Sequence, residues 1–268
     1  METTASPMDA LCDDLAAEHD ALDRIVADGQ RLAEPTPAAG WSVGDQISHL
    51  WFFDQRALLA LTDPDAFTDD ARRLVAAMAD TSGTDMSVEV GRAIGPDDLI
   101  ARWRADRRAL IDHGRTVDPK SRVPWYGPSM SARSFLTARL METWAHGQDV
   151  VDALGARRDP TDRLRHVAHI GVGARAFSYA ANGATMPDVP IRVELDAPSG
   201  DRWEWGPEQA ADRVTGSALD FCLLVTQRRH RDDVDLLAEG PAADEWLGLA
   251  QAFAGPPGAG RRPGQFAA

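Results

Sequence analysis

Apolar residues recur at three- and four-residue steps through most of the first 183 residues, a spacing that predicts amphipathic helices. Residues of helix-capping type, Ser42, Ser131 and Thr161, are expected to begin three of these helices. Polar or proline-rich stretches around 81–94 and 113–130 are expected to be loops. The helices are predicted at about 11–32, 43–61, 66–80, 96–112, 131–154 and 161–181.

The pattern changes after Met186. Residues 189–195 alternate apolar and polar side chains, which predicts a strand, and residues 202–206 are expected to return as the second strand of a hairpin. Apolar runs at 217–227 and 244–253 predict two short helices. The fold class is therefore predicted to be mainly α, with a helical domain at 1–185, a small α+β domain at 186–255 and a tail rich in proline and glycine at 256–268.

Composition excludes several classes of function. The formal net charge is −14, from 28 basic and 42 acidic residues, and such a surface repels nucleic acid. No apolar run approaches the roughly 18–20 residues that span a bilayer, and the acidic N-terminus does not resemble a signal peptide. The two cysteines form neither a disulfide framework nor a CxxC motif. We therefore expect a cytoplasmic monomer or homodimer that binds neither nucleic acid nor membranes.

Two histidines and one glutamate are candidate metal ligands. Glu142 and His146 are four residues apart on a predicted helix, so both side chains share one face and can reach one ion. His49 lies among apolar residues of the helix at 43–61. Each feature alone has an ordinary explanation. Glu142 and His146 could be a pair on the helix surface, and His49 could be a hydrogen-bonded histidine of the core. Together they are typical of a metal site inside a helical bundle.

Other conspicuous side chains are expected to pack rather than to react. The cysteines lie in apolar surroundings, one histidine pair lacks an evident third ligand, and two tryptophans share one face of a predicted strand. These residues are Cys12, Cys222, His166, His169, Trp203 and Trp205. His19 is expected to be either a structural residue or part of a pocket, and the segment 125–127 can wall a cleft before the Glu142 helix.

Three segments carry a resemblance to a known family. Residues 40–50, GWSVGDQISHL, resemble the GWTVRDVLAHL signature of the DinB-like metalloenzyme superfamily, and residues 142–155, ETWAHGQDVVDALG, resemble its E…HGWDLARALG segment. The best-matching branch is the mycothiol-dependent, maleylpyruvate-isomerase-like proteins of actinobacteria. Residues 215–229, TGSALDFCLLVTQRR, resemble the GPAADLLLWLLGR helix of their second domain. The resemblance implies a DinB-like four-helix-bundle metal-binding domain followed by a small, sterol-carrier-like α+β domain.

The resemblance also implies a ligand set. The metal ligands of the family correspond to His49, Glu142 and His146, although many relatives carry histidine in place of the glutamate. Two histidines and one carboxylate leave a coordination position open, which is the pattern of catalytic zinc. Zinc is the expected metal, with nickel, iron or manganese as alternatives. Asp45 and Asp149 are either hydrogen-bond acceptors for the ligand histidines or ordinary acids on a helix surface.

An open zinc site favours thiol chemistry, because a zinc-bound thiol loses its proton near neutral pH. Since neither cysteine is a convincing nucleophile, the resemblance implies mycothiol as the co-substrate that attacks a small electrophilic molecule, in an S-transfer or a cis–trans isomerisation. The family resemblance further implies that Arg228 or Arg229 holds a substrate carboxylate, although either cation could simply stabilise a helix C-terminus. A metal-dependent hydrolase and a non-catalytic carrier of a small molecule are the alternatives.

Overall fold

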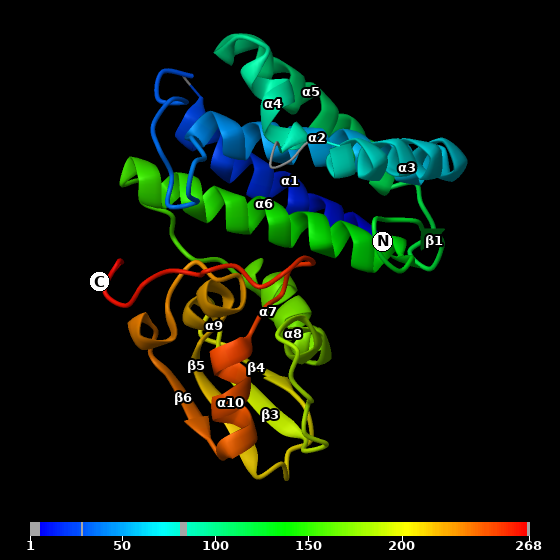
Figure 1. Ribbon diagram of the computed structural model, residues 1–268. Coiled ribbons are helices and arrows are strands. Elements are labelled where there is room, and N and C mark those ends of the chain that lie inside the picture. Colours follow the sequence, from blue (N-terminus) through cyan, green and yellow to red (C-terminus); the bar gives the residue numbers. More distant parts are fainter. Residues whose placement is uncertain (1–5, 28, 81–84, 267–268) are drawn as a thin grey trace, which may run out of the picture. The chain divides into compact units, whose positions relative to one another are not determined.

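The computed structural model describes residues 6–27, 29–80 and 85–266 (Figure 1). The chain divides into two compact units, Met1–Arg158 and Asp159–Ala268. This division falls earlier than the boundary at 185 expected from the sequence. Two helices that were expected in the first domain belong to the second unit. Helix α7 (Leu164–Gly173) packs against α9 (Ala218–Val225), and α8 (Arg175–Ala181) packs against α10 (Pro241–Leu249).

Four long helices form a bundle in the first unit (Figure 1): α1 (Pro7–Val26), α2 (Val43–Thr62), α5 (Pro96–Gly114) and α6 (Ala132–Leu154). Helices α1 and α2 each pack against both α5 and α6. Helices α3 (Pro64–Asp80) and α4 (Met86–Arg92) add to the bundle by packing against α2. A two-stranded ladder, β1 (Arg122–Val123) with β2 (Met130–Ser131), leads into α6.

Local sequence determines where α2 begins and where α6 begins and ends. Ser42 accepts a hydrogen bond from the backbone of Asp45, whose carboxylate bonds back to the backbone of Ser42, so α2 starts with a complete capping box. Ser131 caps α6 as predicted, and Gly155 ends it in the left-handed conformation that glycine favours. The start of α2 and both ends of α6 are therefore set by their own residues.

The bundle core consists of aliphatic side chains and two tryptophans from α1, α2, α5 and α6. Helix α1 ends at Val26, earlier than expected, because the chain turns at Gly29, where φ is +64°. Leu32 still reaches the core, but from the loop. At roughly 1.5–3 kcal/mol for each fully buried large apolar side chain, this core holds α2 and α6 in a fixed relation. Its members include Leu22, Val43, Ile47, Leu50, Trp51, Leu99, Ile100, Trp103 and Val150.

The second unit is a four-stranded sheet in the order β4-β3-β5-β6, packed against α9 and α10. The predicted hairpin is present, as β3 (Ile191–Asp196) pairs antiparallel with β4 (Arg202–Trp205). The sequence did not reveal β5 (Asp212–Ser217), which runs parallel to β3, or β6 (Leu236–Glu239). A short 3-10 turn, η1 (Arg231–Asp233), precedes β6.

The predicted fold class is confirmed: the protein is mainly α, with a four-helix bundle followed by a small α+β unit. Among the helices that the structure describes, none has the length and apolar content needed to cross a membrane.

Candidate metal centre

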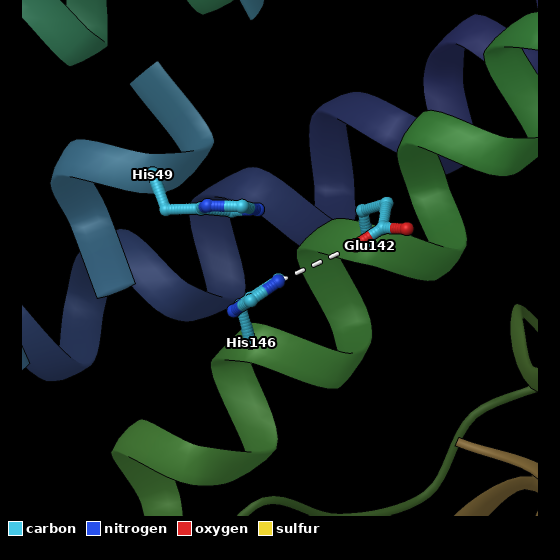
Figure 2. A group of neighbouring side chains, drawn as sticks. All are labelled: His49, Glu142 and His146. Atoms are coloured by element: carbon cyan, nitrogen blue, oxygen red, sulfur yellow. Dashed lines mark ion pairs between the residues drawn. The ribbon is translucent and has the colours of Figure 1, made fainter. Parts of the chain in front are cut away.

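Helices α2 and α6 bring His49, Glu142 and His146 together (Figure 2). One potential ligand atom from each side chain lies within 4.8 Å of the other two, and all three side chains are partly buried. Nε2 of His146 is 3.3 Å from Oε2 of Glu142, as the helical spacing of four residues predicted. The ring centroids of the two histidines are 4.4 Å apart. In the part of the chain that the structure describes, this is the group of acidic, histidine or cysteine side chains that could hold a metal ion.

His146 is held by Gln46, a fully buried residue of α2. The amide oxygen of Gln46 lies 2.6 Å from Nδ1 of His146. The amide nitrogen of Gln46 donates to the hydroxyl of Thr36 at 3.0 Å. The loop before α2 therefore orients one of the histidines through a side chain that the sequence analysis did not single out.

His49 is held by Ser87, a buried residue of α4. The Ser87 hydroxyl lies 2.9 Å from Nδ1 of His49 and donates to the carboxylate of Asp85 at 2.6 Å. The stretch 81–94 was expected to be a loop; residues 81–84 lie outside the described residues, but the rest of the stretch contains helix α4, with Asp85 as its N-cap. The two histidines thus have separate polar supports, His146 from Gln46 of α2 and His49 from Ser87 of α4.

Close packing positions α4 against α2. A Cβ atom at Gly91 would lie 2.3 Å from the hydroxyl of Ser48, so only glycine allows this approach. The guanidinium of Arg92 binds Asp45 through two hydrogen bonds, of 2.9 and 2.8 Å. Although partial burial alone would raise it, these bonds and the cap at Ser42 lower the pKa of Asp45. Asp45 therefore anchors α4, while Gln46 and Ser87 are the residues that lie next to the Nδ1 atoms of His146 and His49.

The three residues fit a divalent metal ion on chemical grounds. Glutamine oxygen is an acceptor only, so it takes the hydrogen on Nδ1 of His146 and leaves the lone pair of the neutral ring on Nε2. That lone pair faces the carboxylate of Glu142 at 3.3 Å. Two electron-rich atoms at this distance need a cation between them, either a proton or a metal ion. Histidine nitrogen and carboxylate oxygen are the donors typical of catalytic zinc.

Aromatic rings surround the histidines. Trp41 stacks on His146 with ring centroids 5.9 Å apart and also contacts His49, and the ring of Phe53 lies 4.7 Å from that of His49. Phe53 in turn contacts Trp125 and Tyr126. Burial raises the pKa of Tyr126 to about 12, so its hydroxyl stays protonated at neutral pH. The segment at 125–127 thus lies one ring away from His49.

Beyond these rings lies an apolar groove of about 440 Å³ between α3 and the segment before α6. Its walls include Phe67, Ala71, Val75, Pro124, Trp125 and Tyr126.

A buried ionic cluster joins α1, α2 and α6 within the same bundle. Arg139 donates to the fully buried carboxylate of Asp54 at 2.9 Å, and Nε2 of His19 lies 3.5 Å from the other oxygen. Although desolvation opposes it, the charge of Arg139 and the hydrogen bond with His19 lower the pKa of Asp54. His19 also contacts the hydroxyl of Thr143, the neighbour of Glu142. His19 is therefore a structural residue of the bundle interior.

The remaining candidates divide as follows. Both cysteines are buried and form no disulfide, and burial raises the pKa of Cys12, so Cys12 is not an activated thiol. His169 is exposed and accepts from the indole of Trp205. Arg228 donates to the carbonyl oxygen of Thr226, and the guanidinium of Arg229 lies over the ring of Phe266. The roles suggested for Arg228 and Arg229 stay predictions.

These features define a helical bundle with a histidine–glutamate–histidine cluster of the kind that binds a metal ion. Residues 15–151 match the family model described as "Mycothiol maleylpyruvate isomerase N-terminal domain", and residues 187–239 match one described as "Wyosine base formation". The chain belongs to the mycothiol maleylpyruvate isomerase family, the DinB-like branch that its motifs indicated.

Similar proteins extend this assignment over nearly the whole chain. Two uncharacterized proteins of Mycobacterium tuberculosis, MT0041 (strain CDC 1551 / Oshkosh) and Rv0036c (strain ATCC 25618 / H37Rv), are 50% identical over 252 residues. The match covers 92% of this chain and 96% of each relative. The crystal structure of a mycothiol-dependent maleylpyruvate isomerase shares the fold at 18% identity, with a TM-score of 0.55 and coverage of 89% of this chain and 96% of that one.

Proposed function

We propose that the protein is a metal-dependent enzyme that uses a low-molecular-weight thiol, mycothiol or a close analogue, to attack an electrophilic small molecule. His49, Glu142 and His146 would hold the metal, with zinc as the expected ion. When bound, zinc supplies Lewis acidity that keeps a thiol ionised near neutral pH. The observation that carries the proposal is the convergence of these three donors in a bundle whose own cysteine, Cys12, is buried and has a raised pKa.

The chain contributes orientation and a dry surface to this chemistry. Gln46 and Ser87 hold the histidine rings, and Trp41 and Phe53 cover their faces. Aromatic walls exclude water and favour a flat or apolar electrophile, such as a conjugated alkene. Addition of the thiol sulfur to one carbon of such an alkene would turn the double bond into a rotatable single bond. Elimination of the same thiol would then restore the double bond, so isomerisation consumes no thiol, whereas S-transfer stops at the adduct.

A substrate carboxylate would need a cation. Within the first unit, Arg56 is already paired with Asp70 at 3.0 Å, and Arg72 with Asp69 at 2.7 Å. The family resemblance suggests Arg228 or Arg229 of the second unit for this role, and a guanidinium binds a carboxylate through two hydrogen bonds. Replacing each by alanine should raise KM for a carboxylate substrate more than it lowers kcat, with Arg202→Ala, an exposed arginine of the same unit, as the control.

The primary test is the metal content of the purified protein by mass spectrometry. We expect about one zinc ion per chain in the wild type, and loss of it in His49→Ala, Glu142→Gln and His146→Ala. The control is His169→Ala, because His169 is exposed and lies in the other unit. Absence of metal in wild-type protein grown with added zinc would refute the proposal.

The dependence on thiol separates the proposed activity from its alternatives. Turnover of electrophilic substrates only with added mycothiol supports the thiol enzyme. Turnover of esters or amides without thiol would indicate a metal hydrolase, with water in the open position. Tight binding of an apolar molecule with no turnover, unaffected by removal of the metal, would indicate a carrier.

A further inference from the structure

Each histidine of the candidate metal centre is supported by its own chain of hydrogen bonds. We propose that Gln46 and Ser87 are positioning residues that fix the hydrogen of each ring on Nδ1 and so direct Nε2 of His146 and His49 toward one metal ion. The inference rests on the proposed function, because it assigns these residues a role toward the metal that the cluster would hold.

Thr36 determines how the amide of Gln46 is oriented. The Thr36 hydroxyl donates its single hydrogen to the carbonyl oxygen of Trp41 at 2.9 Å. It therefore accepts from the amide nitrogen of Gln46, which lies 3.0 Å away. The amide oxygen is then the atom that faces Nδ1 of His146 at 2.6 Å, and this oxygen can only accept. Nδ1 of His146 carries the hydrogen, and Nε2 carries the lone pair.

Asp85 has the same effect on Ser87. The Ser87 hydroxyl donates its single hydrogen to Oδ1 of Asp85 at 2.6 Å, and Asp85 is kept in place because it also accepts from the backbone of Ser87 at 2.9 Å. The hydroxyl oxygen is left to accept from Nδ1 of His49 at 2.9 Å. The lone pair of the neutral His49 ring therefore also lies on Nε2.

The two supports differ in origin but end at the same ring position. One runs through the loop before α2, and the other through α4. Gln46 and Ser87 are both buried, so bulk water does not replace them when they are removed. Without an acceptor at Nδ1, a histidine ring populates both tautomers and rotates more freely, and in the wrong tautomer Nε2 cannot bind a metal.

The test measures zinc affinity by competition with a chromophoric chelator, using zinc alone and no substrate. Gln46→Met and Ser87→Ala should each weaken zinc binding by about 10–100-fold, as loss of such a supporting partner typically does. Thr36→Val, which touches neither histidine and keeps the shape of threonine, should weaken it by about tenfold, while Thr36→Ser keeps the hydroxyl and should stay within about threefold of wild type.

Two matched variants control for a merely structural effect. Thr137→Val removes a buried hydroxyl that bonds only within α6, and Ser178→Ala removes a buried hydroxyl of the second unit. Both should leave zinc affinity unchanged even if they lower the melting temperature. Circular dichroism shows which variants fold. If Gln46→Met does not fold, the comparison of Thr36→Val with Thr36→Ser still decides the test.

A second readout examines the tautomers directly. Nitrogen-15 NMR of the zinc-loaded wild type should show Nδ1 protonated and Nε2 bound to zinc in both histidines. Zinc binding through Nδ1, or wild-type affinity in Gln46→Met, Ser87→Ala and Thr36→Val, would overturn this inference while leaving the proposed function intact. A wild-type protein that binds no zinc would overturn both.

Discussion

Replacing Asp54 by leucine should lower the free energy of unfolding by about 3–5 kcal/mol, because it leaves a buried guanidinium without its counter-ion. Asp54 is fully buried and the Arg139 side chain is 5% exposed. Arg139 donates to Oδ1 of Asp54 from two nitrogens, at 3.2 and 2.9 Å, and His19 adds a contact at 3.5 Å. The new leucine gains apolar burial, but that gain, roughly 1.5–3 kcal/mol, does not restore hydrogen bonds to a desolvated cation.

The assay is urea-induced unfolding followed by far-ultraviolet circular dichroism, a signal to which the long helices of the bundle contribute most. The double variant Asp54→Leu/Arg139→Leu removes both charges and should recover most of the loss, since apolar pairs often replace buried ion pairs without cost. Asp69→Leu is the control, because its pair with Arg72 is largely exposed and should be worth under about 0.5 kcal/mol. A single variant within about 1 kcal/mol of wild type, or a double variant as unstable as the sum of its parts, would refute the reasoning.

Three further predictions concern pH, packing and capping. The pKa of Asp54 is lower in the folded protein than in the unfolded chain, so its stabilisation is complete above about pH 4 and is lost as the pH falls through the folded-state pKa. Acid titration monitored by circular dichroism should therefore be steeper for wild type than for Asp54→Leu/Arg139→Leu, and equal slopes would contradict this. Gly91→Val should push α4 from α2 and weaken zinc binding at least about tenfold, whereas Gly248→Val, where the added Cβ meets no atom, should not alter zinc affinity. Ser42→Ala should cost about 1 kcal/mol in urea unfolding through loss of the α2 cap, and an unchanged midpoint would argue against that cap.

The bundle could be predicted from the sequence because the features that define its helices, apolar periodicity and capping residues, are local in the chain. Apolar periodicity and the capping residues Ser42 and Ser131 place α2 and α6 within a few residues. Spacing of four residues on a helix aligned Glu142 with His146, and the family resemblance connected this pair with His49.

The supports of the site could not be predicted in this way. Helix α4 is seven residues long, and its buried positions are Ser87, Val88 and Gly91, which form no apolar stripe. Gln46 belongs to no motif that marks it as functional, and only the folded structure shows that its amide faces a histidine. Likewise, β5 contains few apolar residues and has no alternating pattern of its own. Its position is set by pairing with β3, so its sequence did not predict a strand.

The stacking of Trp41 on His146 gives this protein a built-in optical reporter. Indole fluorescence responds to a charged or metal-bound imidazole in contact with its ring, and Trp41 touches both histidines of the centre. Occupancy of the site should therefore change the emission of the unlabelled protein, although it contains eight tryptophans. Trp41→Phe would keep an aromatic wall while silencing that change, so binding could be followed in real time with no added dye.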